Sequence, residues 1–411
     1  MLSIRKDLEF FPYQQGNKKF ILIKDHLGLV GEGKAVPLTL FQFMSLLDGS
    51  SDIRDLQMKL IRQSGGLLVD IDQVKRIIHE LDCSYLLESE RFYNARDKII
   101  NEFVSKDIRP CSHCGLAYPI DPLSLKKRLD EILNLNSKTT AIEKHAVALI
   151  APHIDMSVGE QVYASAYSSI KHQRPSRVII LGVGHYLTDG LFSVTSKDFE
   201  TPLGIVKTDK EAVGILNDAG GSVFSKNDFV HKSEHSIEFQ IIFLQHLMPQ
   251  NSFKIIPILC GGVQSHLSGY TRKAYLDKVG GFLKALRDIR DQDEHQTLVV
   301  VGIDLSHIGP KFGHQTPATY IESRSKAHDQ RILESVTRLD ADGLWEESGR
   351  IKDQFNLCGF SALACMMEIL PPCKGQIIDY KIWHESPTNS AVSFAAAIFT
   401  PLERPDAESS G

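Results

Sequence analysis

Four apolar stretches limit the folds that are open to this chain. Each is long enough for one buried strand, and together they occupy residues 147–152, 177–184, 253–260 and 297–304. Helical patterns such as 160–170 and 275–289 lie between them, and 390–399 is a further apolar run. Continuous apolar strands that alternate with helices are typical of a parallel sheet covered on both faces. We therefore expect an α/β fold with a central, largely parallel sheet and helices on both faces.

Side chains that can bind a metal follow these strands. The four strands run into His153, His185, Cys260, and Asp304 with His307, respectively. Ligands of open α/β sheets bind where the carboxyl ends of the strands meet, and neutral imidazole suits zinc, copper and iron. A single histidine is more often a surface residue, and Asp304 could simply cap a turn. Their convergence at one predicted edge favours a metal site, with Cys260 as a buried strand residue.

Two further motifs carry chemistry. Cys358 stands just before an apolar helical stretch, where a helix N-terminus lowers a thiol pKa and favours the thiolate that binds metals. The motif EHSIE places Glu234 and Glu238 four residues apart on one helix face, with His235 between them. These groups could hold the metal ligands by hydrogen bonds or transfer protons. The spacing is not HExxH, which excludes that zinc-protease motif.

Seven cysteines are an odd number at low density, which is typical of a reduced, cytoplasmic protein. Cys111 and Cys114 form an isolated CxxC motif, which could be a redox pair or half of a zinc site, and we place it outside the active centre. Cys365 and Cys373 lie within or after the apolar helix and are interpreted as packing residues.

The N-terminal residues differ from the rest of the chain in their pattern of predicted helices and strands. A strand at 18–25, helices at 38–49, 51–63 and 70–82, and a last strand at 84–93 predict a winged-helix-like domain over 1–93. Residues 1–91 hold 12 Lys and Arg against 13 Asp and Glu, so we prefer a peptide- or protein-docking role to DNA binding. We expect residues 94–144 to be a linker and the start of the second region, 145–403 to be the α/β domain, and 404–411 to be a disordered tail.

Composition excludes several classes of partner. A length of 411 residues suggests two or three domains. A formal net charge of −5 gives no electrostatic reason to expect nucleic acid and does not favour an anionic membrane surface. We find no apolar run near the roughly 20 residues that span a bilayer, and no export signal in MLSIRKDLEFF. We therefore expect a cytoplasmic protein with neither a nucleic-acid nor a membrane partner.

An ordered set of motifs carries a family resemblance: GLAYP (115–119), APH (151–153), GVGH (182–185), TPLG (201–204), EHSIE (234–238), DLSH (304–307) and CG (358–359). Residues 115–403 resemble the Memo-like family, also called AmmeMemoRadiSam system protein B. That family is similar in fold to the LigB-type, class III extradiol dioxygenases, which hold non-haem Fe(II) with two histidines and a carboxylate. Residues 30–90, with a DG turn and VKRIIHELDCSYLLE, resemble the PqqD-like domains, which bind peptides for modifying enzymes. The alternative for this segment is a structural cap with no partner.

The resemblance implies roles for individual residues. The metal ligands would be His153, His185 and Cys358, with a thiolate in place of the carboxylate, which suits iron or copper and allows zinc. His307 would act as acid and base with Asp304 orienting it, and His235, Glu234 and Glu238 would support the site. The chain departs from the family's usual pattern at Ile154 and Asp155, and Asp155 could itself approach the metal.

The resemblance also implies partners, namely a radical-SAM protein and an AMMECR-type protein of the same system, with a peptide at the PqqD-like domain. The leading expectation is a metal-dependent, oxygenase-like or redox enzyme. The alternative is an adaptor that binds a metal and a peptide or protein without chemistry.

Overall fold

The structure is a computed structural model, and it describes residues 2–16, 18–31, 33–63, 65–135, 145–292 and 297–402. The tail expected at 404–411 lies outside these residues. The chain divides into two compact units, Met1–Ser105 and Lys106–Gly411, and each is described by itself. In the part that the structure describes, no helix is both long and apolar enough to cross a membrane.

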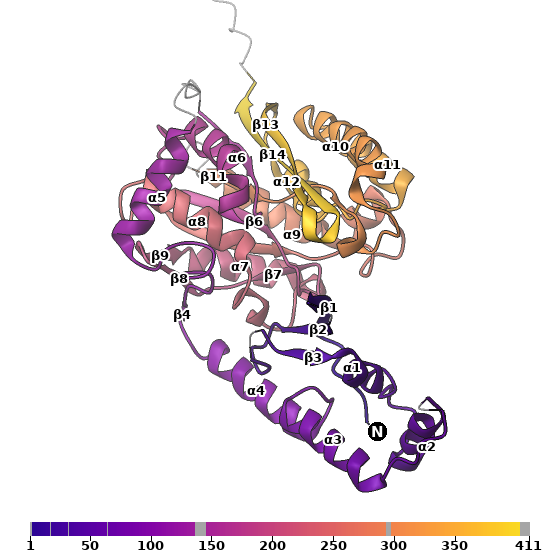
Figure 1. The fold of residues 1–411 in the computed structure, drawn as a ribbon. Coiled ribbons are helices and arrows are strands. Elements are labelled where there is room, and N and C mark those ends of the chain that lie inside the picture. The colour runs from indigo at the N-terminus through magenta and orange to yellow at the C-terminus, as the bar shows by residue number, and fades with distance from the viewer. Residues whose placement is uncertain are drawn as a thin grey trace, which may run out of the picture. The chain divides into compact units, whose positions relative to one another are not determined.

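The first unit combines a small sheet with helices (Figure 1). Its antiparallel strands, in the order β1-β2-β3, are β1 (Leu8–Gln15), β2 (Lys18–Asp25) and β3 (Ala35–Pro37). Its helices are α1 (Leu38–Met44), α2 (Ile53–Gln63), α3 (Ile71–Cys83) and α4 (Glu90–Val104). The strand at 18–25 and the three predicted helices are confirmed. The core of the unit includes the buried side chains of Met44, Leu56, Val74 and Leu81.

The strand predicted at 84–93 is wrong. Residues from Glu90 onwards belong to α4, and the side chain of Ser89 accepts a hydrogen bond from the backbone N–H of Phe92. Phe92 and Tyr93 are helical because this serine caps a first turn, whereas Leu86 and Leu87 precede the helix and are buried in the core of the unit. Residue 93, where we expected the first domain to end, therefore lies inside a helix, and the first compact unit runs on to Ser105.

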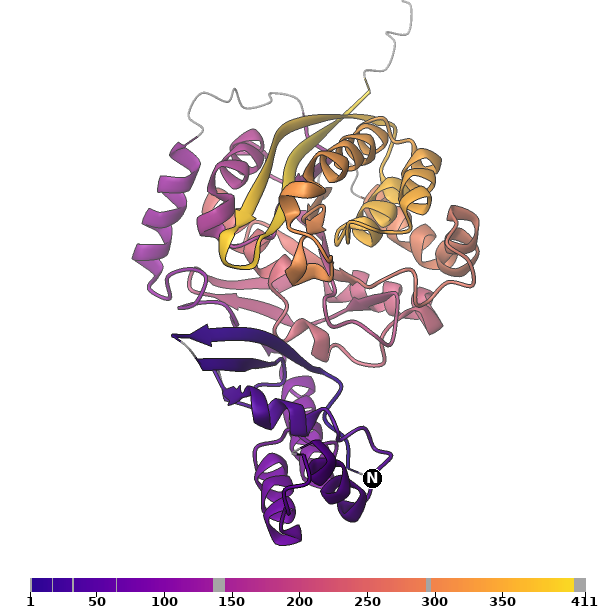
Figure 2. The same ribbon diagram turned by 45° about the vertical axis from the view of Figure 1, so that its right-hand side comes forward.

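The second unit is built on a mixed, mostly parallel sheet. Its centre is four adjacent parallel strands in the order β5 (Ala148–Ala151), β11 (Thr297–Gly302), β6 (Arg177–Val183) and β10 (Lys254–Cys260). These are the four apolar stretches of the sequence, so the predicted parallel sheet is confirmed. β14 (Ser390–Pro401) pairs antiparallel with β5, and β13 (Cys373–Glu385) pairs with β14 in a long hairpin, drawn in yellow in Figure 2.

The remaining strands extend the sheet at its two sides. They are β4 (Ile108–Arg109), β7 (Phe192–Val194), β8 (Asp198–Thr201), β9 (Gly204–Thr208) and β12 (His307–Ile308). The helices are α5 (Pro122–Asn134), α6 (Met156–Ser169), α7 (Lys210–Gly220), α8 (His235–Leu247), α9 (Arg272–Gln292), α10 (Glu322–Thr337), α11 (Ala341–Ile351) and α12 (Phe360–Ile369). β12 pairs with β14, which brings the DLSH motif to the sheet.

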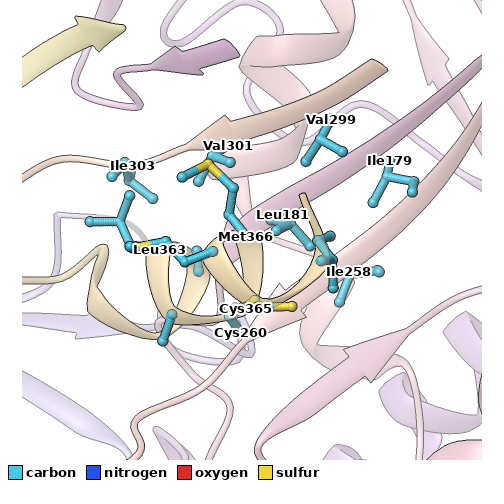
Figure 3. Packing of buried hydrophobic residues seen from close by; sticks show 14 of the residues in the cluster. Ile179, Leu181, Ile258, Cys260, Val299, Val301, Ile303, Leu363, Cys365 and Met366 are labelled. Atoms are coloured by element: carbon cyan, nitrogen blue, oxygen red, sulfur yellow. The ribbon is translucent and has the colours of Figure 1, made fainter. Parts of the chain in front are cut away.

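Alternate side chains of the central strands enter two different cores. Ile179 and Leu181 belong to one cluster, which also contains residues of α7, α9 and α12. Val178 and Ile180 belong to the other, which contains residues of α5, α6 and α8. Figure 3 shows the first cluster, with Leu363 and Met366 of α12 lying against the strands. Helices therefore cover both faces, as the uniformly apolar strands predict.

Candidate metal centre

Three histidines from separate elements come together at the carboxyl edge of the sheet. His153 and His185 follow β5 and β6, and His235 is the first residue of α8. The ring centroids are 5.0 Å apart for His153–His185, 5.1 Å for His153–His235 and 5.0 Å for His185–His235. One ring nitrogen of each lies within 4.8 Å of the other two. We call these residues the histidine group.

Two glycines allow α8 to reach the strand ends. A Cβ added at Gly182 of β6 would lie 2.6 Å from Oγ of Ser236. A Cβ added at Gly302 of β11 would lie 2.4 Å from the carbonyl oxygen of Ser236. Ser236 in turn hydrogen-bonds the backbone of Val183 through its hydroxyl. The first turn of α8 therefore sits directly on the sheet, and this places His235 beside the two strand-end histidines.

Hydrogen bonds fix which ring nitrogen of His153 and of His185 carries the proton. Nδ1 of His153 lies 3.0 Å from the carbonyl oxygen of Gly302, which can only accept a hydrogen bond. Nδ1 of His185 lies 3.1 and 3.0 Å from the two carboxylate oxygens of Glu234. Each Nδ1 therefore donates, and each Nε2 carries the lone pair that a metal needs. This arrangement is the usual support of histidine ligands in metal sites.

Burial favours the neutral form of His153 and of His235. Burial lowers the pKa of His235 well below 6.5 and outweighs the opposing charge of Glu234. Burial also lowers the pKa of His153, against the charge of Asp304. His153 is only 2% exposed, whereas 29% of the His185 side chain and 31% of the His235 side chain are exposed. The group is thus open to solvent on one side, at His185 and His235.

Glu234 joins two of the histidines to the start of α8. Its side chain caps the helix by accepting the backbone N–H groups of His235 and Ser236. Burial alone would raise the pKa of Glu234, but His185 and His235 hold it well below 4.5. The carboxylate is therefore ionised and supports the site, as the sequence indicated, although it does so from the cap of the helix.

Cys358 lies beside the histidine group. Its Sγ is 3.7 Å from Nε2 of His153 and 3.3 Å from the carbonyl oxygen of Asp304. Sulfur and nitrogen ligands on one tetrahedral zinc ion would be about 3.6 Å apart. The expected lowering of its pKa by α12 is wrong, since burial and the charge of Asp304 raise the pKa of this thiol well above 9.0. A metal that binds here would have to displace the thiol proton.

The donors therefore fit a transition metal. Two nitrogens that are each about 2.1 Å from one ion lie at most about 4.2 Å apart, so a small inward movement of the rings brings the nitrogens of His153 and His185, now within 4.8 Å of each other, to ligand distance. His153, with its Nε2 facing Cys358, requires no such movement toward the thiol.

Asp304 and His307 lie on the loop that follows β11. Oδ1 of Asp304 accepts the backbone N–H groups of His153 at 3.1 Å and Ile154 at 3.2 Å. The His307 ring is held by the carbonyl oxygen of Leu305, 3.0 Å from Nδ1. Asp304 therefore positions the His153 loop, and it acts on His307 through its charge. Burial lowers the pKa of His307 to about 4, which leaves Nε2 unprotonated near pH 7.

Glu238 points away from the histidines, toward the segment 109–118. It forms a fully buried ion pair with Arg109, and it accepts the backbone N–H groups of Ser112 at 3.0 Å and His113 at 2.9 Å and the hydroxyl of Tyr118. Burial alone would raise its pKa, but the charge of Arg109 and contacts with His113 and Tyr118 hold the pKa well below 4.5. The sequence did not assign Arg109 or Tyr118 to this support.

The remaining candidate residues cap a helix, pack in the core or form a disulfide. Asp155 accepts hydrogen bonds from the backbone N–H and the hydroxyl of Ser157 and caps α6. Cys260, Cys365 and Cys373 are buried in the first core, as predicted. Cys111 and Cys114 form a disulfide, so this pair is oxidised in the structure, in contrast to the reduced state expected from the cysteine count.

Comparison with known proteins agrees with the motifs. A model of the family described as "Memo-like protein" matches residues 109–398. The chain belongs to the Memo-like protein family. A MEMO1 family protein of Aquifex aeolicus is 33% identical over 399 residues, covering 96% of this chain and 100% of that protein. That match extends into the first unit, which the family model leaves out.

More distant relatives carry the same description. A MEMO1 family protein of Thermus thermophilus is 24% identical and covers 83% of this chain and 96% of its own length. One from Methanosarcina barkeri is 24% identical, with 69% and 97% covered. Among solved structures, an uncharacterized protein from Escherichia coli K12 aligns with a TM-score of 0.40 and 11% identity, over 61% of this chain and 98% of that one.

Proposed function

We propose that this member of the Memo-like family is a metal-dependent, oxygenase-like or redox enzyme, with one iron or copper ion bound by His153, His185 and Cys358. The observation that carries the proposal is a pair of imidazoles, His153 and His185, whose ring centroids lie 5.0 Å apart and whose Nδ1 atoms donate to the protein, with the thiol of Cys358 3.7 Å from Nε2 of His153. A thiolate with two imidazoles suits copper, iron or zinc. Of these metals, iron and copper supply electron transfer to molecular oxygen.

The residues around the donors have separate tasks. His307, neutral and with Nε2 unprotonated, takes up a proton from a substrate group. Asp304 holds the His153 loop and stabilises the imidazolium that forms on His307 through its charge. His235 lies on the open side of the group and is neutral, so it can accept a second proton.

The test is oxygen uptake by protein that has been reconstituted anaerobically with Fe(II), Cu(I) or Zn(II) in separate samples. We expect oxygen consumption that requires iron or copper and a reducing substrate and that is absent with zinc. His307→Ala should keep the metal and lose oxygen uptake. A metal with all its positions filled by protein, together with no oxygen uptake and retention of a peptide, would support the adaptor role instead.

The resemblances carry a proposal about partners. We propose that the first unit acts like a PqqD-like domain that binds a peptide for a radical-SAM protein, with an AMMECR-type protein in the same system. The near balance of charges in residues 1–91 favours such a partner over DNA. Size-exclusion chromatography of the full chain with each protein tests this proposal, since a shifted common peak supports it. A salt-sensitive complex with duplex DNA instead would contradict it.

A further inference from the structure

The disulfide between Cys111 and Cys114 closes a short, partly exposed loop. Both cysteines are partly exposed, so a thiol in solution can reach them. The loop lies between β4, which contains Arg109, and Tyr118. A bond across so short a loop restricts the backbone of the two residues inside it, Ser112 and His113.

Those two residues hold the buried carboxylate of α8. The backbone N–H groups of Ser112 and His113 and the hydroxyl of Ser112 all donate to Glu238, at 3.0, 2.9 and 3.0 Å. The two N–H groups converge on one carboxylate, and the disulfide limits how far the loop that carries them can move. Opening the disulfide removes that constraint, whereas the contacts of Arg109 and Tyr118 with Glu238 come from residues outside the closed loop.

The same helix turn joins this loop to the metal centre. Glu238 lies one turn after Glu234, which caps α8 and holds Nδ1 of His185. The ring of His113 also lies 5.5 Å from the ring of His235, centroid to centroid. The loop thus contacts α8 from one side while the strand-end histidines contact it from the other.

We propose that Cys111 and Cys114 form a thiol–disulfide exchange site for a dithiol reductant, and that closing the disulfide strengthens metal binding at the centre formed by His153, His185 and Cys358. The second half rests on the metal centre of the proposed function. The first half does not, since it concerns only the two sulfurs.

The exchange step is a two-electron reaction. A thiolate of the reductant attacks one sulfur of the pair, forms a mixed disulfide and releases the other cysteine, which takes a proton. The second thiol of the reductant then breaks the mixed disulfide. In sum, two electrons and two protons pass from the dithiol to Cys111 and Cys114, and the reductant leaves as its own disulfide.

The first experiment counts thiols in the folded, full-length protein. The Cys83→Ser background removes an exposed free thiol. The protein is equilibrated with a series of reduced and oxidised dithiothreitol mixtures, alkylated without unfolding and analysed by mass spectrometry. We expect two additional labels, at Cys111 and Cys114, to appear in reducing mixtures and to disappear in oxidising ones. If the pair stays closed across the series while the protein remains folded, the exchange site is wrong.

The second experiment measures coupling with zinc as the probe. The oxidised Cys83→Ser protein is compared with Cys83→Ser/Cys111→Ser/Cys114→Ser, which cannot close the loop and has no thiols there to bind zinc. Competition with a chromophoric chelator should show an affinity about five-fold or more weaker in the triple variant. Equal affinities would overturn the coupling. Zinc binding by neither protein would overturn the metal centre and the coupling together, while the thiol count would still decide the exchange site.

Discussion

Nδ1 of His185 donates to both carboxylate oxygens of Glu234, at 3.1 and 3.0 Å. Glu234 uses the same carboxylate to cap α8, so one side chain fixes the tautomer of a strand-end histidine and the start of the helix that carries His235. Because the proton is held on Nδ1, the lone pair of His185 is on Nε2. The geometry of the metal centre therefore depends on Glu234, although Glu234 is not one of the proposed metal ligands.

Glu234→Gln should weaken metal binding without abolishing it. The amide cannot accept hydrogen bonds with both of its head-group atoms, so His185 loses one partner and the control of its tautomer. Loss of such support typically lowers metal affinity about 10- to 100-fold. Zinc competition with a chelator measures the change. The exposed Glu211→Gln on α7 is the control, and an unchanged affinity for Glu234→Gln would contradict the assigned role.

Glu238→Gln should destabilise the second unit most strongly near neutral pH. The variant leaves Arg109 as an unpaired buried charge, which typically costs about 3–5 kcal/mol. The folded-state pKa of Glu238 lies well below its ordinary value of 4.5, so the wild type has this stabilisation in full above about pH 5. It begins to lose it as the pH falls below 4.5 and loses the rest only as the pH falls towards the folded-state pKa. Urea denaturation should show the same difference from wild type at pH 7 and 5 and a difference that shrinks as the pH is lowered further to 4 and 3. The exposed Glu131→Gln is the control, and a difference that does not depend on pH would contradict the argument.

Gly302→Ala should disturb both stability and the metal centre. Its new Cβ would lie 2.4 Å from the carbonyl oxygen of Ser236 and 2.7 Å from Nε2 of Gln240, so α8 must move away from β11. Overpacking of this kind typically costs about 1–3 kcal/mol. Gly214→Ala on α7 is the matched control, since its Cβ meets no atom within 4 Å and alanine favours the helix. Thermal unfolding of both variants distinguishes them, and equal melting temperatures would contradict the close approach.

Part of this site could be predicted from the sequence, since the end of each continuous apolar run marks the end of a buried strand. Apolar runs that finish at His153, His185 and Asp304 predict one edge of a parallel sheet, and the structure places all three there. The EHSIE motif indicates a supporting role for His235, but its place beside the strand-end histidines depends on how closely α8 approaches the sheet. That approach depends on Gly182 and Gly302, whose packing has no signal in the local pattern.

Long-range contacts account for the other differences. The pKa of Cys358 follows burial and the charge of Asp304, which outweigh the helix position that the sequence shows. Glu234 and Glu238 are on one helix in sequence, yet one faces His185 and the other faces Arg109, 129 residues away along the chain. In the first unit, an apolar segment at 84–93 suggested a strand, but the cap at Ser89 begins a helix there.

The metal content of protein purified without oxygen tests the central claim most directly. Wild type is compared with His153→Ala, His185→Ala, His235→Ala and Cys358→Ala, with the exposed His172→Ala as control, by elemental mass spectrometry. We predict about one equivalent of iron or copper in wild type, His172→Ala and His235→Ala, and its loss in the other three variants, because each removes a ligand from the ion. A wild-type protein that holds no metal and takes up none on reconstitution would contradict the account.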